Sequence, residues 1–273
     1  MSNASAPLFL NGRWLVCRPE DYDVRYKINP WMDPARVPEK QLALNQWNNL
    51  HHHLLRLGAW LEYVPHESGF PDMVFTANAG LVDGRDVVLS TFRHKERQGE
   101  APHFRAWFEA NGYRVHTVNG AAFEGEGDAL FLGRKLVCGY GFRSDLSAHS
   151  QIGVLLKVRE VVSVELIDPR FYHLDTCFAP LNESTVLIYP NAFTPEGLVE
   201  LEKHAELIRV SEADALHFVC NAVVLGTSIV LPAGCPDTYA LLAKRGFTVY
   251  PVELSEFIKA GGAAKCLTVK LDR

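Results

Sequence analysis

Residues suited to the chemistry of guanidinium or urea groups recur along this chain at intervals of about 45 to 50 residues. Each carries an amide, carboxylate, imidazole or thiol beside a short hydrophobic segment: Asn78, Glu124 and Asp128, His173 and Asp175, Asn221, and Cys266. A fixed period of this length predicts radial repetition of one supersecondary unit. Equivalent positions in a closed ring converge on its axis, so these side chains are expected to meet in one site. The pattern favours an enzyme.

Cys266 is the candidate nucleophile. It follows Gly261-Gly262, where backbone can approach a ligand closely, and it opens an alternating segment that is predicted to be a strand. His173 and Asp175 stand two residues apart on a strand-like segment, so both side chains are expected to face the same side. The alternatives are a structural buried cysteine and a His–Asp pair with no catalytic role.

The acidic run Glu-Gly-Glu-Gly-Asp, residues 124–128, precedes a hydrophobic segment. Burying three carboxylates is costly unless cations or protons compensate for their charge. The alternative is an exposed turn. The run therefore predicts either a solvated loop or a buried site with compensating groups beside it.

The chain has 273 residues, of which 48% are hydrophobic and 22% charged, and a net charge of −5. This balance is typical of a globular protein with a full core. An acidic chain gives no reason to expect nucleic acid as a partner. No apolar segment approaches the roughly 20 residues of a membrane span. The N-terminal segment lacks the features of a secretion signal, so a cytoplasmic location is expected.

No metal or other cofactor is expected. The six cysteines include no CxxC pair, which argues against a zinc site, and we expect most of them to be small buried hydrophobes. The run His51-His52-His53 lies within a predicted helix, where consecutive side chains point in different directions and cannot all reach one ion. His94 is expected in a loop.

The repeated element is predicted to be a hairpin followed by a helix and a further strand. Hairpin patterns occupy residues 79–90, 128–138 and 221–231. Helical patterns occupy residues 38–59, 100–111, 145–158, 195–207 and 236–245. Strand-like segments follow at 113–118, 161–167 and 247–252. No linker divides the chain and no nucleotide-binding motif follows a strand, which favours one ring-shaped α/β domain over residues 1–273 and argues against a doubly wound sheet.

Four segments together resemble the guanidino-group-modifying superfamily, the penteins: FTANAG (75–80), EGEGD (124–128), HLDT (173–176) and GGAAKCLT (261–268). The resemblance covers essentially the whole chain. It implies a five-bladed, pseudo-symmetric α/β propeller built of ββαβ units, with a central site. It also implies a cysteine-dependent hydrolase acting on linear amidines.

The resemblance implies a role for each matching residue. Cys266 matches the nucleophile, His173 the general acid/base, and Asp175 a guanidinium-binding carboxylate. Glu124 matches the other essential carboxylate. The family run is usually EGGD, so Glu126 stays as an alternative to Glu124.

Further residues are implied to bind substrate. Arg97 and Arg143 resemble arginines that hold the substrate α-carboxylate; their alternative is an exposed surface position. Asn29 resembles part of a covering N-terminal segment, and Asn221 joins the predicted substrate-binding set.

Asn78 departs from the arginine deiminases, which carry aspartate there. An amide offers a donor as well as an acceptor, so it could hold a guanidinium first and a neutral ureido group afterwards. The TAN form resembles the arginine dihydrolases, which convert arginine to ornithine, carbon dioxide and two molecules of ammonia. We therefore expect this activity. Since the chain ends at Arg273, no ornithine-processing domain and no proline formation are expected.

Several alternatives stay open. A dimethylargininase differs in the room around the guanidino nitrogens, and arginine deiminase, citrulline hydrolase and amidinotransferase activities use related sites. The non-catalytic alternative is ribosome binding, as in translation initiation factor six, a pentein that lacks the catalytic set. The expected partner is a small guanidino substrate, arginine or a methylated arginine, and exposed blade edges are compatible with a homo-oligomer.

Overall fold

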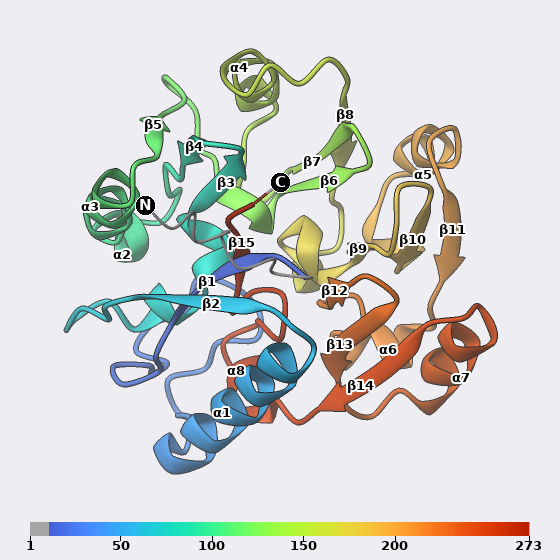
Figure 1. Ribbon diagram of the computed structural model, residues 1–273, viewed down its shortest axis with the longest axis horizontal. Helices are drawn as coiled ribbons and strands as arrows, with labels where there is room; N and C mark the ends of the chain where they lie inside the picture. Colours follow the sequence, from blue (N-terminus) through green and yellow to red (C-terminus); the bar gives the residue numbers. More distant parts are fainter. Residues whose placement is uncertain (1–10, 273) are drawn as a thin grey trace, which may run out of the picture.

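A computed structural model describes residues 11–272, in which five three-stranded sheets form a ring (Figure 1). In every sheet the middle strand pairs antiparallel with one neighbour and parallel with the other. A helix lies between the two parallel strands in sequence, as a parallel connection requires. The predicted five-bladed α/β propeller of ββαβ units is confirmed.

Four blades follow one another along the chain. The first contains β3 (Gly80–Asp83), β4 (Asp86–Leu89), α2 (Lys95–Gln98), α3 (Ala101–Ala110) and β5 (Arg114–His116). The second contains β6 (Ala129–Leu132), β7 (Lys135–Tyr140), α4 (Leu146–Leu155) and β8 (Val161–Glu165). The third contains β9 (Phe178–Pro180), β10 (Thr185–Ile188), α5 (Pro195–Glu202) and β11 (Glu206–Arg209), and the fourth α6 (Glu212–Leu216), β12 (Val223–Leu225), β13 (Ser228–Pro232), α7 (Pro236–Lys244) and β14 (Thr248–Val252).

The two ends of the chain build the fifth blade together. It contains β1 (Arg13–Cys17), α1 (Lys40–Arg56) and β2 (Trp60–Val64), and β15 (Val269–Lys270) pairs antiparallel with β1 after the short helix α8 (Ser255–Ile258). This pairing closes the ring and brings the segment of Cys266 to its centre, where β15 runs in Figure 1.

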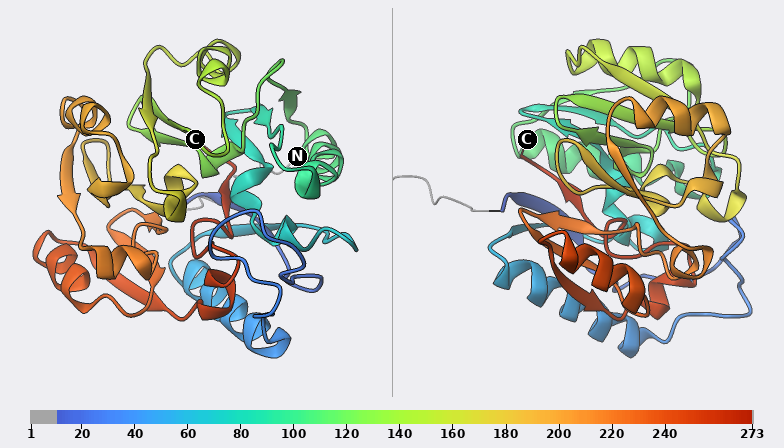
Figure 2. Two further views of the ribbon diagram at one scale, coloured as in Figure 1. Left: turned by 180° about the vertical axis from the view of Figure 1, so that it is seen from behind. Right: turned by 90° about the vertical axis from the view of Figure 1, so that its right-hand side faces the viewer.

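Hydrophobic faces hold the long helices on the outside of the ring (Figures 1 and 2). In α3, Phe104 and Phe108 are spaced one helical turn apart and are fully buried against Val87 and Leu89 of β4. Burying a side chain of this size stabilises the fold by about 1.5–3 kcal/mol. The turn from β3 to β4 consists of Gly84-Arg85, and Gly84 has φ +58°, which suits the tight hairpin turns that join twisted strands.

Short 3₁₀ turns at the inner ends of the blades carry the polar residues singled out by the sequence. These turns are η2 (Thr76–Ala79), η3 (Gly125–Gly127) and η5 (Leu174–Thr176), and each directly precedes the first strand of a blade or lies next to it. The prediction that His173 and Asp175 lie on a strand is therefore wrong. His173 directly precedes the turn with extended backbone and Asp175 lies within it, so the two side chains reach different neighbours.

Other element boundaries also differ from the predictions. The helix predicted over 195–207 ends at Glu202, and β11 begins at Glu206 because its backbone pairs in parallel with β10. The hairpin of β9 and β10 was not predicted. Cys266 does not open a strand: β15 is confined to Val269–Lys270, and Cys266 lies in the turn before it.

Among residues 11–272, no helix is long and apolar enough to cross a membrane. Most of the N-terminal segment used for the expectation about secretion, residues 1–10, lies outside the described residues.

Candidate active site

The thiol of Cys266 is buried at the centre of the ring, where only 3% of the residue is exposed. Its Sγ lies 3.2 Å from Asp175 Oδ2, to which the thiol donates, and accepts a hydrogen bond from Asn221 Nδ2 at 3.0 Å. Burial and the neighbouring Asp175 carboxyl raise the pKa of the Cys266 thiol well above its ordinary value. Without a cation nearby, the thiol form is therefore favoured.

Asp175 combines deep burial with one free oxygen. Burial raises the pKa of its carboxyl to about 7, against the opposing field of the Lys265 ammonium. Oδ2 accepts from the Cys266 thiol, whereas the buried Oδ1 has no hydrogen-bond partner among the described residues. A buried oxygen in this state is an acceptor available to a ligand cation beside the nucleophile.

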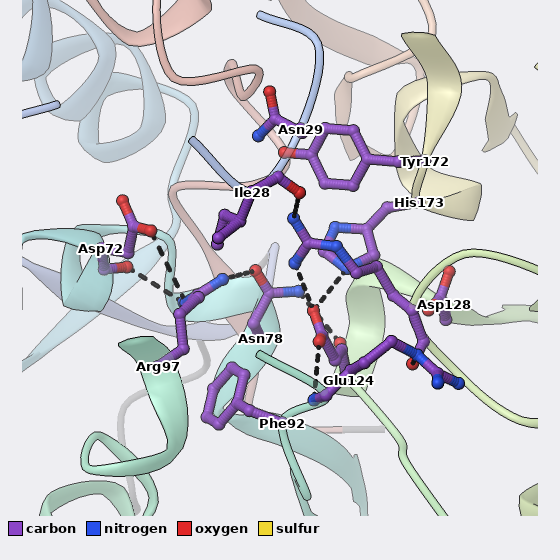
Figure 3. A network of polar contacts seen from close by, with 12 residues as sticks. Ile28, Asn29, Asp72, Asn78, Phe92, Arg97, Glu124, Asp128, Tyr172 and His173 are labelled. Carbon is purple, nitrogen blue, oxygen red and sulfur yellow. Dashed lines mark hydrogen bonds and ion pairs between the residues drawn. The ribbon is translucent and has the colours of Figure 1, made fainter. Parts of the chain in front are cut away.

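Glu124 lies between an imidazole and a guanidinium (Figure 3). Its Oε2 is 2.8 Å from His173 Nε2 and accepts from Arg143 Nη1 at 2.9 Å, and its Oε1 accepts from Arg93 N at 3.2 Å. Burial alone would raise the pKa of Glu124, but Arg143 and His173 together hold it below its ordinary value. Glu124 therefore stays ionised, and its Oε2 lies within hydrogen-bond distance of His173 Nε2.

Arg97 forms a second buried cluster in the same view (Figure 3). It makes two hydrogen bonds of 2.8 Å with Glu100 and donates to Asn78 Oδ1 at 2.7 Å, while its guanidinium lies over the Phe92 ring. Asn78 Nδ2 donates in turn to the carbonyl of Glu124 at 3.0 Å. The amide is thus held with its oxygen toward Arg97 and its nitrogen toward the acidic run.

Asp72 is a candidate site residue that the sequence analysis did not identify. Its carboxyl is almost fully buried, Oδ2 accepts from Tyr26 at 3.0 Å, and Oδ1 has no hydrogen-bond partner among the described residues. Burial raises its pKa, although Arg97 opposes the shift. Asp72 falls outside the repeat of about 45 residues, and the one available signal was an acidic residue within the hydrophobic run Phe70–Phe75.

A small cavity of about 10 Å³ lies beside these groups, although Glu124, His173 and Asp175 do not line it. Its walls combine the two predicted arginines, Asp72, Asn78 and the nucleophile with apolar side chains: Ile28, Asn29, Met32, Asp72, Phe75, Asn78, Arg97, Arg143, Tyr172, Ala260 and Cys266. Arg97 and Arg143 are only 3% and 2% exposed, so the alternative of solvated surface arginines is wrong. Asn221 is not among the lining residues.

The N-terminal segment covers this cavity. Asn29 Nδ2 donates to Ala260 O at 2.9 Å, and its Oδ1 accepts from the backbone N–H groups of Trp31 and Met32. The carbonyl of Ile28 accepts from Arg143 at 2.9 Å. Asn29 therefore ties the covering segment to the loop that carries Cys266.

Gly261 and Gly262 lie where neighbouring side chains leave little space for a Cβ atom. Gly261 has φ +82°, and a Cβ on Gly262 would lie 2.5 Å from the Phe75 ring. These glycines thus make room for the protein's own side chains, and the close approach of a ligand to this backbone stays a prediction.

Comparison with known proteins places the chain in a family. A family model described as eukaryotic N,N dimethylarginine dimethylhydrolase matches residues 29–273. The chain belongs to this family. It is 41% identical over 260 residues to an N(G),N(G)-dimethylarginine dimethylaminohydrolase of Mycobacterium tuberculosis, an alignment that covers 95% of this chain and 85% of the relative.

Another relative, ArgZ, is named for a different activity. The chain is 49% identical over 266 residues to the bifunctional arginine dihydrolase/ornithine cyclodeaminase ArgZ of Synechocystis, covering 95% of this chain but 37% of ArgZ. The chain thus spans little more than a third of that relative. A crystal structure of the N-terminal domain of ArgZ bound to product superposes with a TM-score of 0.92 at 47% identity, covering 96% of this chain and 98% of that domain.

In this dimethylarginine hydrolase family member, the acidic run is buried and its charges are compensated. Glu126 points away from Glu124: its Oε2 accepts from Lys265 Nζ at 2.6 Å and from Lys270 N at 3.1 Å. Asp128 accepts from the Ser144 hydroxyl at 2.6 Å and from Leu174 N at 3.1 Å. The alternative of an exposed turn is wrong, and Glu124 is the glutamate that faces His173.

The Glu126–Lys265 pair predicts a test of stability. Replacing Glu126 with leucine leaves the Lys265 ammonium buried without its carboxylate, which is expected to lower the free energy of unfolding by about 3–5 kcal/mol. The double variant Glu126→Leu/Lys265→Met removes both charges and is expected to lose clearly less. Urea denaturation of the three proteins measures both changes; equal losses in the single and double variants would mean that the pair adds no specific interaction.

Asp128 predicts a pH dependence of stability. Burial raises the pKa of its carboxyl to about 6 in the folded protein, above the value of about 3.9 for an unfolded chain. The folded state therefore binds a proton that the unfolded state releases, and the resulting stability is lost as pH rises through about 6. Asp128→Asn is expected to reduce the loss of unfolding free energy between pH 5 and pH 8 by about 1 kcal/mol. Denaturation curves at the two pH values check this, and an unchanged difference would contradict the shift.

The three consecutive histidines do not form a metal site. His51 is buried with its ring against Trp47, whereas His52 is exposed. Among the described residues, no group of three or more His, Cys, Asp or Glu side chains could hold a metal ion. His94 directly precedes α2, next to the segment of Arg97.

Proposed function

We propose that this protein is an arginine dihydrolase, which converts L-arginine and two water molecules to L-ornithine, carbon dioxide and two molecules of ammonia. The observation that carries the proposal is the set of groups around Cys266: an amide at Asn78 and an unpaired carboxylate oxygen on Asp175. The carboxylate suits the guanidinium of arginine, and the amide suits both that cation and the neutral ureido group formed from it.

The guanidinium and the α-amino-acid end of arginine match different groups of the site. The free Asp175 Oδ1 next to the thiol can accept from the guanidinium. At the other end, Arg97 and Arg143 provide cations for the α-carboxylate, and the free Asp72 Oδ1 provides an acceptor for the α-ammonium group. Charge-assisted hydrogen bonds at both ends would fix the central carbon near Sγ.

The reaction then follows from the protonation states of the side chains. The bound guanidinium offsets the negative field of Asp175 and so favours the Cys266 thiolate. The thiolate attacks the central carbon, and His173, oriented by Glu124 and acting as imidazolium, protonates the departing nitrogen, which leaves as ammonia. Water hydrolyses the S-alkylthiouronium intermediate to a ureido group. A second round of attack and hydrolysis releases the second ammonia, carbon dioxide and ornithine.

The relatives support this proposal. ArgZ is named as a bifunctional arginine dihydrolase, and its N-terminal domain, which this chain matches over nearly its full length, has been solved with product bound. The decisive experiment incubates purified protein with L-arginine and quantifies ornithine, citrulline, urea and ammonia over time. Two ammonia per ornithine, with little citrulline and no urea, is the expected result. Citrulline with one ammonia would make the protein a deiminase instead.

Dimethylarginine hydrolysis is the second candidate. It is favoured by the matching family model and by the Mycobacterium tuberculosis relative, which shares 41% of aligned residues over most of its length. The same thiol would attack the guanidino carbon and release dimethylamine, leaving citrulline. Incubation with asymmetric dimethylarginine distinguishes the candidates, because the dihydrolase proposal predicts turnover of arginine and little release of dimethylamine.

A further inference from the structure

Asn221 lies behind the nucleophile, in the turn before β12, and is fully buried. Its Oδ1 accepts from the backbone N–H groups of Ala263 and Cys266, both at 3.1 Å. Its Nδ2 donates to the backbone carbonyl of Asp175 at 3.0 Å and to Cys266 Sγ at 3.0 Å. One amide thus contacts both the loop and the sulfur of the nucleophile.

These backbone contacts fix which end of the amide faces the sulfur. A backbone N–H can only donate and a backbone carbonyl can only accept, so a reversed amide would lose all three backbone contacts. The nitrogen must therefore face Sγ. Sulfur accepts from Asn221 on one side and, as a thiol, donates to Asp175 on the other.

The two neighbours of the sulfur respond oppositely when the thiol loses its proton. The contact with Asp175 loses its donor and becomes one between two anions. The contact with Asn221 becomes a charge-assisted hydrogen bond, which is stronger than the neutral one. Of these two neighbours of the sulfur, Asn221 is the one that favours the thiolate.

We infer that Asn221 is a positioning residue that stabilises the Cys266 thiolate and fixes its sulfur beside Asp175, with no direct contact with the substrate. The inference rests on Cys266 as the nucleophile of the proposed function. It replaces the prediction that Asn221 binds substrate, because both N–H hydrogens of its amide donate to the protein and its oxygen accepts twice.

The test is the pH dependence of Cys266 alkylation by iodoacetamide, followed by mass spectrometry of the peptide that contains it. Iodoacetamide is neutral and needs no carboxylate to bind it, so the rate reports the thiolate. Asn221→Ala is expected to shift the alkylation profile to higher pH by about one unit, a roughly tenfold slower reaction at a fixed pH below the pKa. In the turnover assay, kcat should fall by more than KM changes.

The matched control is Thr268→Val, which removes a buried hydrogen bond to Lys265 O from the same loop but does not touch the sulfur. It is expected to lower Tm and leave the alkylation profile in place. If the profiles of Asn221→Ala and Thr268→Val coincide, Asn221 only braces the loop and the inference is overturned.

Asn221→Asp keeps the inference testable if the alanine variant does not fold. It has nearly the same size and retains an acceptor for the two N–H groups, but it turns an oxygen instead of a donor toward the sulfur. A shift at least as large as that of the alanine variant is expected, and an unshifted profile overturns the inference. Because alkylation needs no substrate, a wrong choice of substrate in the proposed function would leave this result unchanged.

Discussion

Replacing Cys266 with serine is expected to lower the turnover of L-arginine by a factor on the order of 10⁴ or more. A guanidinium carbon is a poor electrophile, and the buried hydroxyl has no neighbouring base positioned to ionise it. Asp175, with a pKa near 7, is far too weak a base to deprotonate serine at neutral pH. Ornithine and ammonia production by the purified variant measures the loss.

Ligand binding distinguishes the loss of the nucleophile from the loss of the folded structure. The serine variant keeps the cavity and its carboxylates, so L-arginine is expected to raise the Tm of this variant and of the unmodified protein alike by ligand binding. Cys235→Ser is the matched control, because Cys235 is buried in another blade with its sulfur against Asp214 O. Wild-type turnover is expected from it. Turnover above about one hundredth of the wild-type rate in Cys266→Ser would argue against covalent catalysis at this position.

The ring could be predicted from the sequence because its evidence is repeated. Each blade has a hydrophobic hairpin, a helix and a strand, and each repeat presents polar residues at the same place. The residues that meet at the centre, among them Cys266, Asp175 and Glu124, were found for the same reason. Repetition converts several weak local signals into one constraint on the fold.

The local geometry of those residues could not be predicted in the same way. A strand and a 3₁₀ turn of three residues have similar lengths and no distinguishing period, so His173 and Asp175 were expected to share one face. The structure instead aims His173 at Glu124 and Asp175 at Cys266. Asp72 was missed because its burial depends on Tyr26 and Arg97, which are distant in sequence.

Different surroundings give the two central carboxylates different chemistry. Glu124 is held ionised by Arg143 and His173, although burial opposes this. Asp175 has no such cation in direct contact, and its pKa rises to about 7. The first can therefore orient His173 as an ionised carboxylate. The second is expected to ionise when a cationic guanidinium binds beside it, and the same cation should favour the Cys266 thiolate.

Asn78→Asp is expected to change the product from ornithine to citrulline. Aspartate still accepts from Arg97 at this position, where the amide oxygen now lies 2.7 Å from Nη1. It loses the Nδ2 donor, one hydrogen of which contacts Glu124 O in the structure, and Asn78 is one of the residues that line the cavity. An ionised carboxylate can bind the guanidinium but repels the carbonyl oxygen of a ureido group, so only the first hydrolytic round should proceed. The ratio of citrulline to ornithine is expected to rise by at least about tenfold.

Asn29→Asp is the control for this change, because it is the same substitution at another wall of the same cavity. Aspartate keeps the oxygen that accepts from Trp31 and Met32 but loses the Nδ2 donor to Ala260 O, so the variant should weaken the cover and raise KM without changing the ratio of products. Product ratios measured at saturating L-arginine separate the two effects. If both variants release citrulline equally, premature opening of the cavity explains the product and Asn78 has no special role. If only Asn78→Asp does so, a single donor decides whether the enzyme performs one hydrolysis or two.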